Sequence, residues 1–360
     1  MPMMYEGSIR EVGKLLSMLT SMLNLRVIGL KYVDKSLTYG ELSSIEELPL
    51  SVEDVQAPSS YKLVEEGASG RFRHSFPSLK YFLYPPIQDV VYVDRDFSFR
   101  EARVDFGNIA LFGVKPCDLY SMRVLDGILM NRDPYYTNAR SSVKIVVVEE
   151  CVKPSNVCFC GSVGTGPWVS SGFDVAFTRL NNGVVFKSGS SIGVDLLKRL
   201  NLKKASDGTL DEYRKSMDKA LESTKVLPEL TALTNALEKS MSNEELWSKV
   251  SKKCVGCSNC NMVCPTCFCT EFFDEAELDG SALRLKKWHG CLSYSYGLVA
   301  GGHFRPKLYM RYRHFILHKF LFYPRQVGLI GCVGCGRCIT WCPLGVDIRE
   351  TLWEVYKSVA

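Results

Sequence analysis

The sequence has no uninterrupted apolar run near the roughly 18 residues that a membrane-spanning helix needs. Stretches such as Ile145–Val148 are short and typical of strands. The N-terminal residues mix Glu6, Arg10, Glu11 and Lys14 with apolar side chains, which indicates an amphipathic helix and not a secretory signal. We therefore expect a water-soluble, cytoplasmic protein with no membrane association.

The sequence also lacks a recognisable nucleotide-binding fingerprint. No GxGxxG segment follows a predicted strand, so we expect no flavin or nicotinamide site in this chain. The loop Gly161–Pro167 has the glycine content of an anion-binding turn, which leaves open a catalyst with its substrate at this loop or at a metal centre. We nevertheless assign no catalytic residue.

Cysteine is absent before Cys117, and the fifteen cysteines then fall into two sets. Four lie between Cys117 and Cys160, and eleven lie between Cys254 and Cys342. In a cytosolic protein, clustered cysteines bind metal more often than they form disulfides. The distribution predicts a chemically divided chain whose C-terminal third binds metal.

A four-cysteine pattern with a following proline occurs twice in the C-terminal set. Its spacing, CxxCxxCxxxCP, is the ligand run of bacterial ferredoxins with two 4Fe-4S clusters, in which the fourth cysteine binds the other cluster. The predicted ligands are Cys254, Cys257, Cys260 and Cys342 for one cluster, and Cys332, Cys335, Cys338 and Cys264 for the other. Thiolates in CxxC pairs also suit zinc, but the repeated run with its proline favours iron and sulfide.

Small residues in these loops support the same assignment. Gly256, Ser258, Gly334 and Gly336 would let the backbone approach a cluster and direct its N–H groups at sulfur. Such hydrogen bonds also tune the reduction potential of a cluster.

Four of the remaining cysteines lie in the upstream part. Cys117 is expected in a loop just before a helix, Cys151 ends a predicted strand, and Cys158 and Cys160 follow in a glycine-rich loop. All four could meet at one sheet edge, so we predict a third 4Fe-4S cluster there. Zinc, or buried thiols that act as small apolar side chains, are the alternatives.

Three cysteines, Cys267, Cys269 and Cys291, lack a fourth. His289 is close in sequence and could complete a metal site with them. We expect instead that the three pack beside the clusters as small apolar side chains.

The segment 281–340 has ten Lys or Arg, four of the five histidines and no Asp or Glu. Alternating cations and aromatic residues allow a nucleic-acid-binding hypothesis. His314 and His318 are spaced to share a metal, but because the segment has no carboxylate we expect a solvated or interface helix face in its place. Cations would also offset the negative charge of thiolate-bound clusters. For the basic residues we favour this charge-compensating role over nucleic-acid binding. We expect Arg311 to contribute to partner docking.

The order of helical and strand patterns predicts two domains and a connector. We expect an α/β N-terminal domain over 1–203, a helical connector over 204–250, and an α+β ferredoxin-like dicluster domain with a helical insertion over 251–360. The expected elements are a helix over 8–22, strands over 26–33, 90–93, 109–114 and 143–148, a helix over 119–130, and a hairpin over 173–186.

Several longer motifs resemble one known family. They are CxxCxxCxxxCPTCFC at 254–269, WHGC at 288–291, AGGHFRP at 300–306, RYRHFILHKF at 311–320, CVGCGRCITWCP at 332–343, FGVKPCDL at 112–119, DPYY at 133–136 and CFCGSVGTGP at 158–167. Over residues 80 to 350 the chain resembles the β subunit of cytosolic sulfhydrogenases and the electron-transfer subunit of anaerobic sulfite reductases. The resemblance implies an electron-transfer protein with 4Fe-4S clusters.

The resemblance also implies a chain without a substrate site, in a hetero-oligomer. It would relay electrons between a flavin-containing, diaphorase-type subunit, which reacts with NAD(P)H, and a catalytic metalloenzyme subunit. We favour a nickel-iron hydrogenase in this catalytic position and keep a siroheme sulfite reductase as the alternative. An iron-sulfur protein that binds nucleic acid is the alternative from another class.

Overall fold

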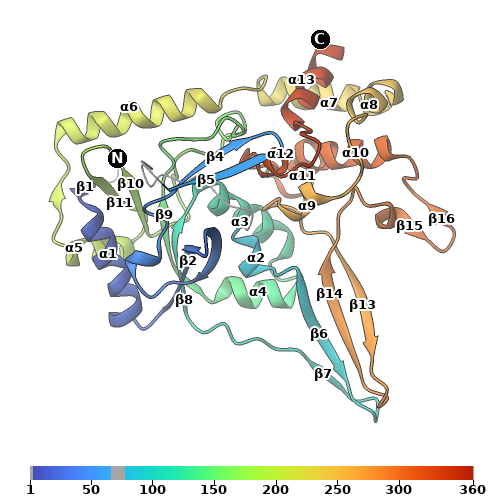
Figure 1. The fold of residues 1–360 in the computed structure, drawn as a ribbon, viewed down its shortest axis with the longest axis horizontal. Helices are drawn as coiled ribbons and strands as arrows, with labels where there is room; N and C mark the ends of the chain where they lie inside the picture. Colours follow the sequence, from blue (N-terminus) through green and yellow to red (C-terminus); the bar gives the residue numbers. More distant parts are fainter. Residues whose placement is uncertain (1–2, 66–77, 360) are drawn as a thin grey trace.

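The upstream part is built on an eight-stranded mixed sheet in this computed structural model, which describes residues 3–65 and 78–359 (Figure 1). The strand order is β12-β1-β11-β10-β9-β8-β2-β3, and β2, β8, β9 and β10 run parallel. The strands are β1 Met4–Gly7, β2 Arg26–Val33, β3 Ser36–Glu41, β8 Ile109–Val114, β9 Val143–Glu149, β10 Val175–Arg179, β11 Val184–Ser188 and β12 Lys203–Lys204.

Helices cover both faces of this sheet. The amphipathic helix α1 (Ile9–Ser17), which continues as a π-helical turn over Met18–Met22, packs on one face with α5 (Ser191–Arg199). The other face carries α2 (Lys80–Leu83), α3 (Pro116–Leu129) and α4 (Pro134–Ser141). The central strands are therefore buried on both sides, which explains their continuous apolar runs.

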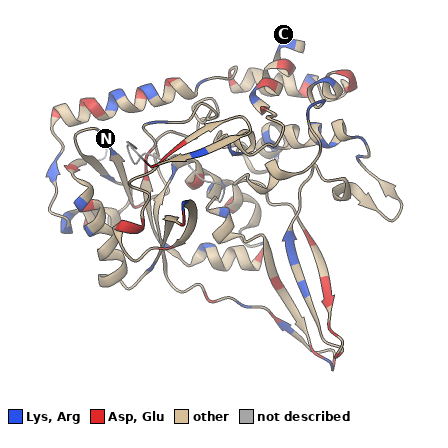
Figure 2. Ribbon diagram, viewed as in Figure 1, with Lys and Arg blue, Asp and Glu red and all other residues tan. Residues whose placement is uncertain are grey.

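The segment expected to be a helical connector contains three helices: α6 (Asp207–Thr224), α7 (Leu230–Lys239) and α8 (Glu244–Val250). Ser206, Glu229 and Asn243 cap these helices by accepting a hydrogen bond from a backbone N–H in the first turn. Helix α6 runs along one edge of the upstream part, and its exposed positions alternate in charge (Figure 2).

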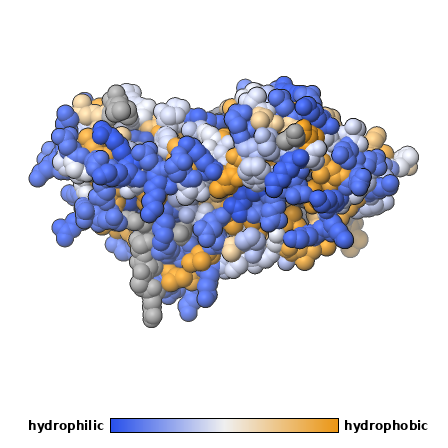
Figure 3. Space-filling view, turned by 90° about the horizontal axis from the view of Figure 1, so that it is seen from above, coloured by the Kyte–Doolittle hydropathy of each residue, from blue (hydrophilic) through white to orange (hydrophobic). Residues whose placement is uncertain are grey.

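The C-terminal part is mainly helical around a second core. Its elements are α9 Asn259–Met262, a 3₁₀ turn Tyr294–Gly297, β15 Leu298–Val299, β16 Gly302–His303, α10 Leu308–Leu317, a π-helical turn His318–Phe322, α11 Tyr323–Val327, α12 Arg337–Thr340 and α13 Ile348–Val359. Trp247, Phe315 and Leu352 pack in this core together with Phe159 from the upstream part. In the view from above, hydrophobic residues gather mostly over this half of the molecule (Figure 3).

One sheet joins strands from both predicted domains. Strands β6 (Ile87–Val93) and β7 (Phe99–Glu101) continue β13 (Thr270–Ala276) and β14 (Ala282–Trp288) in the order β13-β14-β6-β7. This sheet forms an arm that projects from the body (Figure 1). The hairpin of β4 (Glu53–Ala57) and β5 (Ser60–Val64), which follows a 3₁₀ turn at Ile45–Glu47, lies against α12.

The mixed α/β class is confirmed, whereas the ferredoxin-like layout and the division at 203 and 250 stay predictions. Strands β2 and β8 have the predicted bounds, and β10 and β11 form the predicted hairpin. Within the described residues, we find no helix with both the length and the apolar character needed to cross a bilayer.

Candidate metal centres

The two cysteine runs fold into loops of the same local geometry. The backbone N–H of Gly256 donates to Sγ of Cys254, and that of Gly334 donates to Sγ of Cys332, both with an N···S distance of 3.4 Å. Gly256 has φ +70° and Gly334 has φ +63°, a region that glycine enters at little cost. The sequence duplication is therefore also a structural duplication, and two of the four predicted N–H donors, Gly256 and Gly334, point at cysteine sulfur.

Each loop enters a single helical turn through a residue in the left-handed region. That residue is Ser258 (φ +63°) before α9 and Gly336 (φ +76°) before α12. A side chain at position 336 would clash, because a Cβ there would lie 2.5 Å from the carbonyl oxygen of Val157. The glycine is needed because the upstream chain passes so close.

Four predicted ligands line one hollow. Cys254, Cys257, Cys260 and Cys342, here called the first cysteine group, border a small hollow of about 30 Å³ that Cys338 also reaches. The N–H of Val346 donates to Sγ of Cys342 at 3.3 Å. The fourth cysteine of the second run thus lies with the first three of the other run, as the crossed ligation requires.

The second cysteine group is defined as Cys332, Cys335, Cys338 and Cys264, and a buried lysine lies beside Cys264 and Cys332. Lys319 is 4% exposed, and its Nζ donates to Sγ of Cys264 at 3.2 Å. Burial raises the pKa of Cys332 to about 12, and Lys319 and the N–H of Gly334 oppose this rise. Thiols in such a site need cationic partners to ionise, and iron together with Lys319 would provide them.

The third cysteine group is the upstream set, Cys117, Cys151, Cys158 and Cys160. Burial raises the pKa of Cys158, and the neighbouring Cys160 and Cys151 raise it further. Burial also raises the pKa of Cys117, and Cys158 is close enough to add to that rise. Cys117 does not lie in a loop before a helix as expected, because α3 already begins at Pro116, a residue suited to the first helical position.

The second and third groups are in direct contact. Sγ of Cys158 lies 3.7 Å from the carbonyl oxygen of Cys335, and the N–H of Phe159 donates to the carbonyl oxygen of Gly334 at 2.8 Å. The hydroxyl of Thr165 donates to the carbonyl oxygen of Val333 at 2.8 Å. The three groups therefore form one continuous series through the protein, although which thiols ligate which cluster stays a prediction.

A buried ion pair ties the second and third groups together. The guanidinium of Arg337 donates to both carboxylate oxygens of Asp118 at 3.0 Å, and both side chains are 1% exposed. Asp118 follows Cys117, and Arg337 stands between Cys335 and Cys338. Tyr39 also donates its hydroxyl to Asp118, so that the carboxylate is held from two sides.

Part of the basic segment is buried inside the protein. Four of its ten cations, Lys286, Arg311, Lys319 and Arg337, are buried. Arg311 is 7% exposed and donates to the carbonyl oxygens of Leu292, Arg305 and Pro306. Burial raises the pKa of Cys254, and Arg311 opposes this rise. The expected docking function of Arg311 is therefore wrong, and four of the ten cations are not available on the surface to bind a nucleic acid.

His314 and His318 do not form a solvated surface. Their rings stack with centroids 5.3 Å apart, and burial lowers the pKa of His314 to about 4 and that of His318 to about 3. Both are therefore neutral at physiological pH. Across the described residues, no three His, Cys, Asp or Glu side chains are close enough to share a single metal ion. A cubane spreads its ligands over four iron atoms, so its thiolates need not converge on one point.

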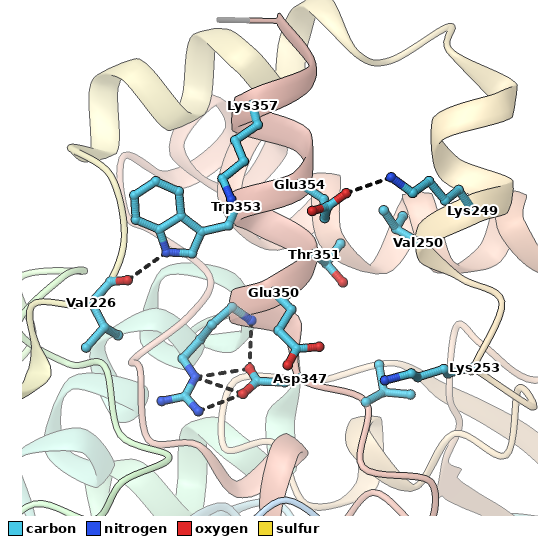
Figure 4. Close-up of a pocket in the computed structure, with 12 residues that line it drawn as sticks. Val226, Lys249, Val250, Lys253, Asp347, Glu350, Thr351, Trp353, Glu354 and Lys357 are labelled. Carbon is cyan, nitrogen blue, oxygen red and sulfur yellow. Dashed lines mark hydrogen bonds and ion pairs between the residues drawn. The ribbon is translucent and has the colours of Figure 1, made fainter.

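A groove of about 1040 Å³ lies beside the first cysteine group (Figure 4). It runs between α8 and α13, and Lys253 and Val346 border both the groove and the hollow of that group. Ion pairs such as Lys249 with Glu354 at 2.8 Å cross it. Cys257 is exposed, so this end of the series is the one that solvent reaches.

Cys117→Ser is expected to remove the third centre alone. About four iron atoms per chain should be lost, because serine is a poor ligand for iron in a 4Fe-4S cluster, while the EPR signals of the other centres remain. Iron and acid-labile sulfide, measured on anaerobically purified protein, test this. An unchanged iron content would exclude a cluster on the third cysteine group.

Comparisons with known proteins agree with this geometry. A family model described as a 4Fe-4S dicluster domain matches residues 253–346. The chain is 31% identical over 339 residues to a protein named sulfhydrogenase 2 subunit beta from Pyrococcus furiosus, and the match covers 93% of each chain. No solved structure matches the chain.

Proposed function

We propose a function from the premise that this chain belongs to the family of sulfhydrogenase β subunits, as its similarity over nearly the whole length shows. It is an iron-sulfur protein of the 4Fe-4S type that transfers electrons. The proposal is that it relays electrons in a hetero-oligomer, between a flavin subunit that reacts with NAD(P)H and the catalytic subunit of a nickel-iron hydrogenase. The relative's name favours a hydrogenase over a sulfite reductase as the partner.

The contact between Cys158 and the backbone of Cys335 carries this proposal. It makes the three cysteine groups a continuous series, from the edge of the upstream sheet to the exposed Cys257. When bound, 4Fe-4S clusters exchange single electrons at potentials that hydrogen bonds, charge and exposure adjust. A chain with several such centres and no recognised nucleotide site is suited to relay electrons between other subunits.

The protein's own residues would hold and adjust the clusters. The N–H groups of Gly256, Gly334 and Val346 donate to cysteine sulfur, and Arg311 and Lys319 place buried positive charge beside the first and second groups. Both effects favour the more negatively charged, reduced state of a cluster. All fifteen cysteines are free of disulfides, which suits the reducing cytoplasm that we propose as the location.

The relay is tested on the anaerobically purified complex. Addition of NAD(P)H should bleach the visible absorption of the clusters in this chain and produce their reduced-state EPR signals. A matched complex that lacks the flavin subunit should show neither change, while dithionite still reduces it. Reduction of the clusters by NAD(P)H without any flavin subunit would contradict the proposal that a separate subunit reacts with NAD(P)H. A protein that contains zinc and no acid-labile sulfide would overturn the electron-carrier function itself.

A further inference from the structure

Three cysteines outside the three groups meet at the base of the arm. Cys269 directly precedes β13 and Cys291 follows β14, and the pairing of these strands brings both to the same end of the hairpin. The N–H of His289 donates to the carbonyl oxygen of Cys269 at 2.8 Å, which closes this end. Cys267 precedes Cys269 by two residues, so the fold gathers sulfur atoms separated by more than twenty residues of sequence.

A buried asparagine connects two of these sulfur atoms. Nδ2 of Asn261 lies 3.3 Å from Sγ of Cys291 and 3.5 Å from Sγ of Cys267, and the side chain is 1% exposed. Its Oδ1 atom is buried and has no hydrogen-bond partner among the described residues. The third sulfur, that of Cys269, is 3.7 Å from the hydroxyl of Tyr296. Polar side chains thus surround the three thiols, although simple apolar packing would not need them.

A buried cation beside these thiols requires negative charge. Lys80 is 2% exposed, and its Nζ contacts the carbonyl oxygens of Cys267 at 3.1 Å and Met262 at 3.4 Å and lies 3.5 Å from the centre of the Trp288 ring. Within residues 3–65 and 78–359, no carboxylate pairs with it. The thiols of Cys267, Cys264 and Cys269 are close enough to Lys80 to act on its charge.

A buried ammonium without an anion is costly, so the site is arranged for a negatively charged occupant. The other groups follow the same rule: Arg311 lies beside the first, Lys319 beside the second, and Arg337 between the second and third. Lys80 is a further buried cation, and the cysteines next to it are mostly those without an assigned cluster. Three neutral thiols would not compensate its charge.

We propose that Cys267, Cys269 and Cys291 hold a further iron-sulfur cluster of cubane type, with no cysteine at its fourth position. Asn261 and Tyr296 would contact its sulfur ligands, and Lys80 would offset its charge. Mononuclear zinc with His289 is less suited to this site, because Nε2 of His289 is held by the hydroxyl of Ser295 at 2.9 Å. Cys267 also contacts Cys264, so the new centre borders the second group and branches from the series of clusters. The expectation that these cysteines only pack beside the clusters is replaced by this proposal.

The test uses the full chain with Cys269→Ser and Cys291→Ser, each purified anaerobically. Wild-type protein should contain about fifteen or sixteen iron atoms, and each variant should lose about three or four together with a similar amount of acid-labile sulfide. EPR of the reduced variants should retain the signals of the other centres. Phe268→Leu is the control, because Phe268 stands between Cys267 and Cys269 and supplies no thiol, and this variant should keep all of its iron.

Cys269 is only partly buried, so Cys269→Ser decides the matter if Cys291→Ser does not fold. An unchanged iron and sulfide content in Cys269→Ser, or the loss of one zinc ion in place of iron, would overturn the proposal. Neither result would alter the reduction of the other clusters by NAD(P)H. Failure of this inference is therefore distinguishable from failure of the proposed function.

Discussion

Replacing Asp118 by asparagine is expected to destabilise the protein by about 3 to 5 kcal/mol, the usual cost of breaking a buried ion pair. The guanidinium of Arg337 is 1% exposed, and the substitution would remove the carboxylate charge that accepts two of its hydrogen bonds. Asparagine keeps nearly the same shape, so the effect reports charge and not a cavity. The unfolding midpoint in urea, measured anaerobically by cluster absorption and far-UV circular dichroism, checks this expectation.

The arm offers a matched control for this substitution. Asp274 also forms a two-bond pair with an arginine, Arg284, at 2.7 and 2.8 Å, but both side chains are about half exposed. Asp274→Asn should leave the midpoint nearly unchanged, because water replaces the lost interaction. Equal effects of the two substitutions would show that burial does not determine the importance of the Asp118 pair. A loss of the second and third centres from folded Asp118→Asn, with the first centre retained, would show that the pair holds those two centres together.

Cys335→Ser is expected to remove one centre of the C-terminal pair and to interrupt the relay. Iron should fall by about four atoms per chain, because a cluster of this type depends on all four thiolates. The backbone of Cys335 contacts Cys158, so the lost centre is the one that adjoins the third group. Electron transfer from NAD(P)H to the catalytic subunit should then fall to background in the assembled complex.

Val333→Ala is the control for this experiment, because Val333 is buried in the same loop and supplies no thiol. It should keep the full iron content and most of the electron-transfer rate, at a modest cost in stability. A Cys335→Ser variant that retains all its iron would contradict the assigned ligands. A variant that loses the iron but transfers electrons at the normal rate would place the second group outside the relay.

The sequence allowed most local elements to be predicted. The bounds of β2 and β8, the helices between 204 and 250 and the hairpin of β10 and β11 follow from apolar periodicity and turn residues. The arm was missed, because it pairs residues 87–101 with residues 270–288. Such non-local pairing leaves no periodic signal in either segment, and β6 alone looks like a strand of the upstream sheet.

The positions of the cations in the basic segment were also only partly predictable from the sequence. Composition predicts that its cations lie near the clusters, and Lys319 and Arg311 do. Composition does not separate a docking surface from a buried partner, so the prediction placed Arg311 in the wrong environment. Nothing in the sequence indicated that Lys80 lies beside cysteines. The residues that it contacts in space follow it by more than 180 positions in the chain.

Cysteine spacing by itself determined the chemistry of the C-terminal third. A CxxCxxCxxxCP run can present three thiols to one cluster only through tight turns, and these constraints lie within a dozen residues of chain. Only the tertiary structure decided that Cys117, Cys151, Cys158 and Cys160 meet, that this group touches Cys335, and that Cys267 and Cys269 lie beside a buried lysine. These contacts depend on how sheets and helices that are distant in sequence pack together, and the local spacing of cysteines does not predict that packing.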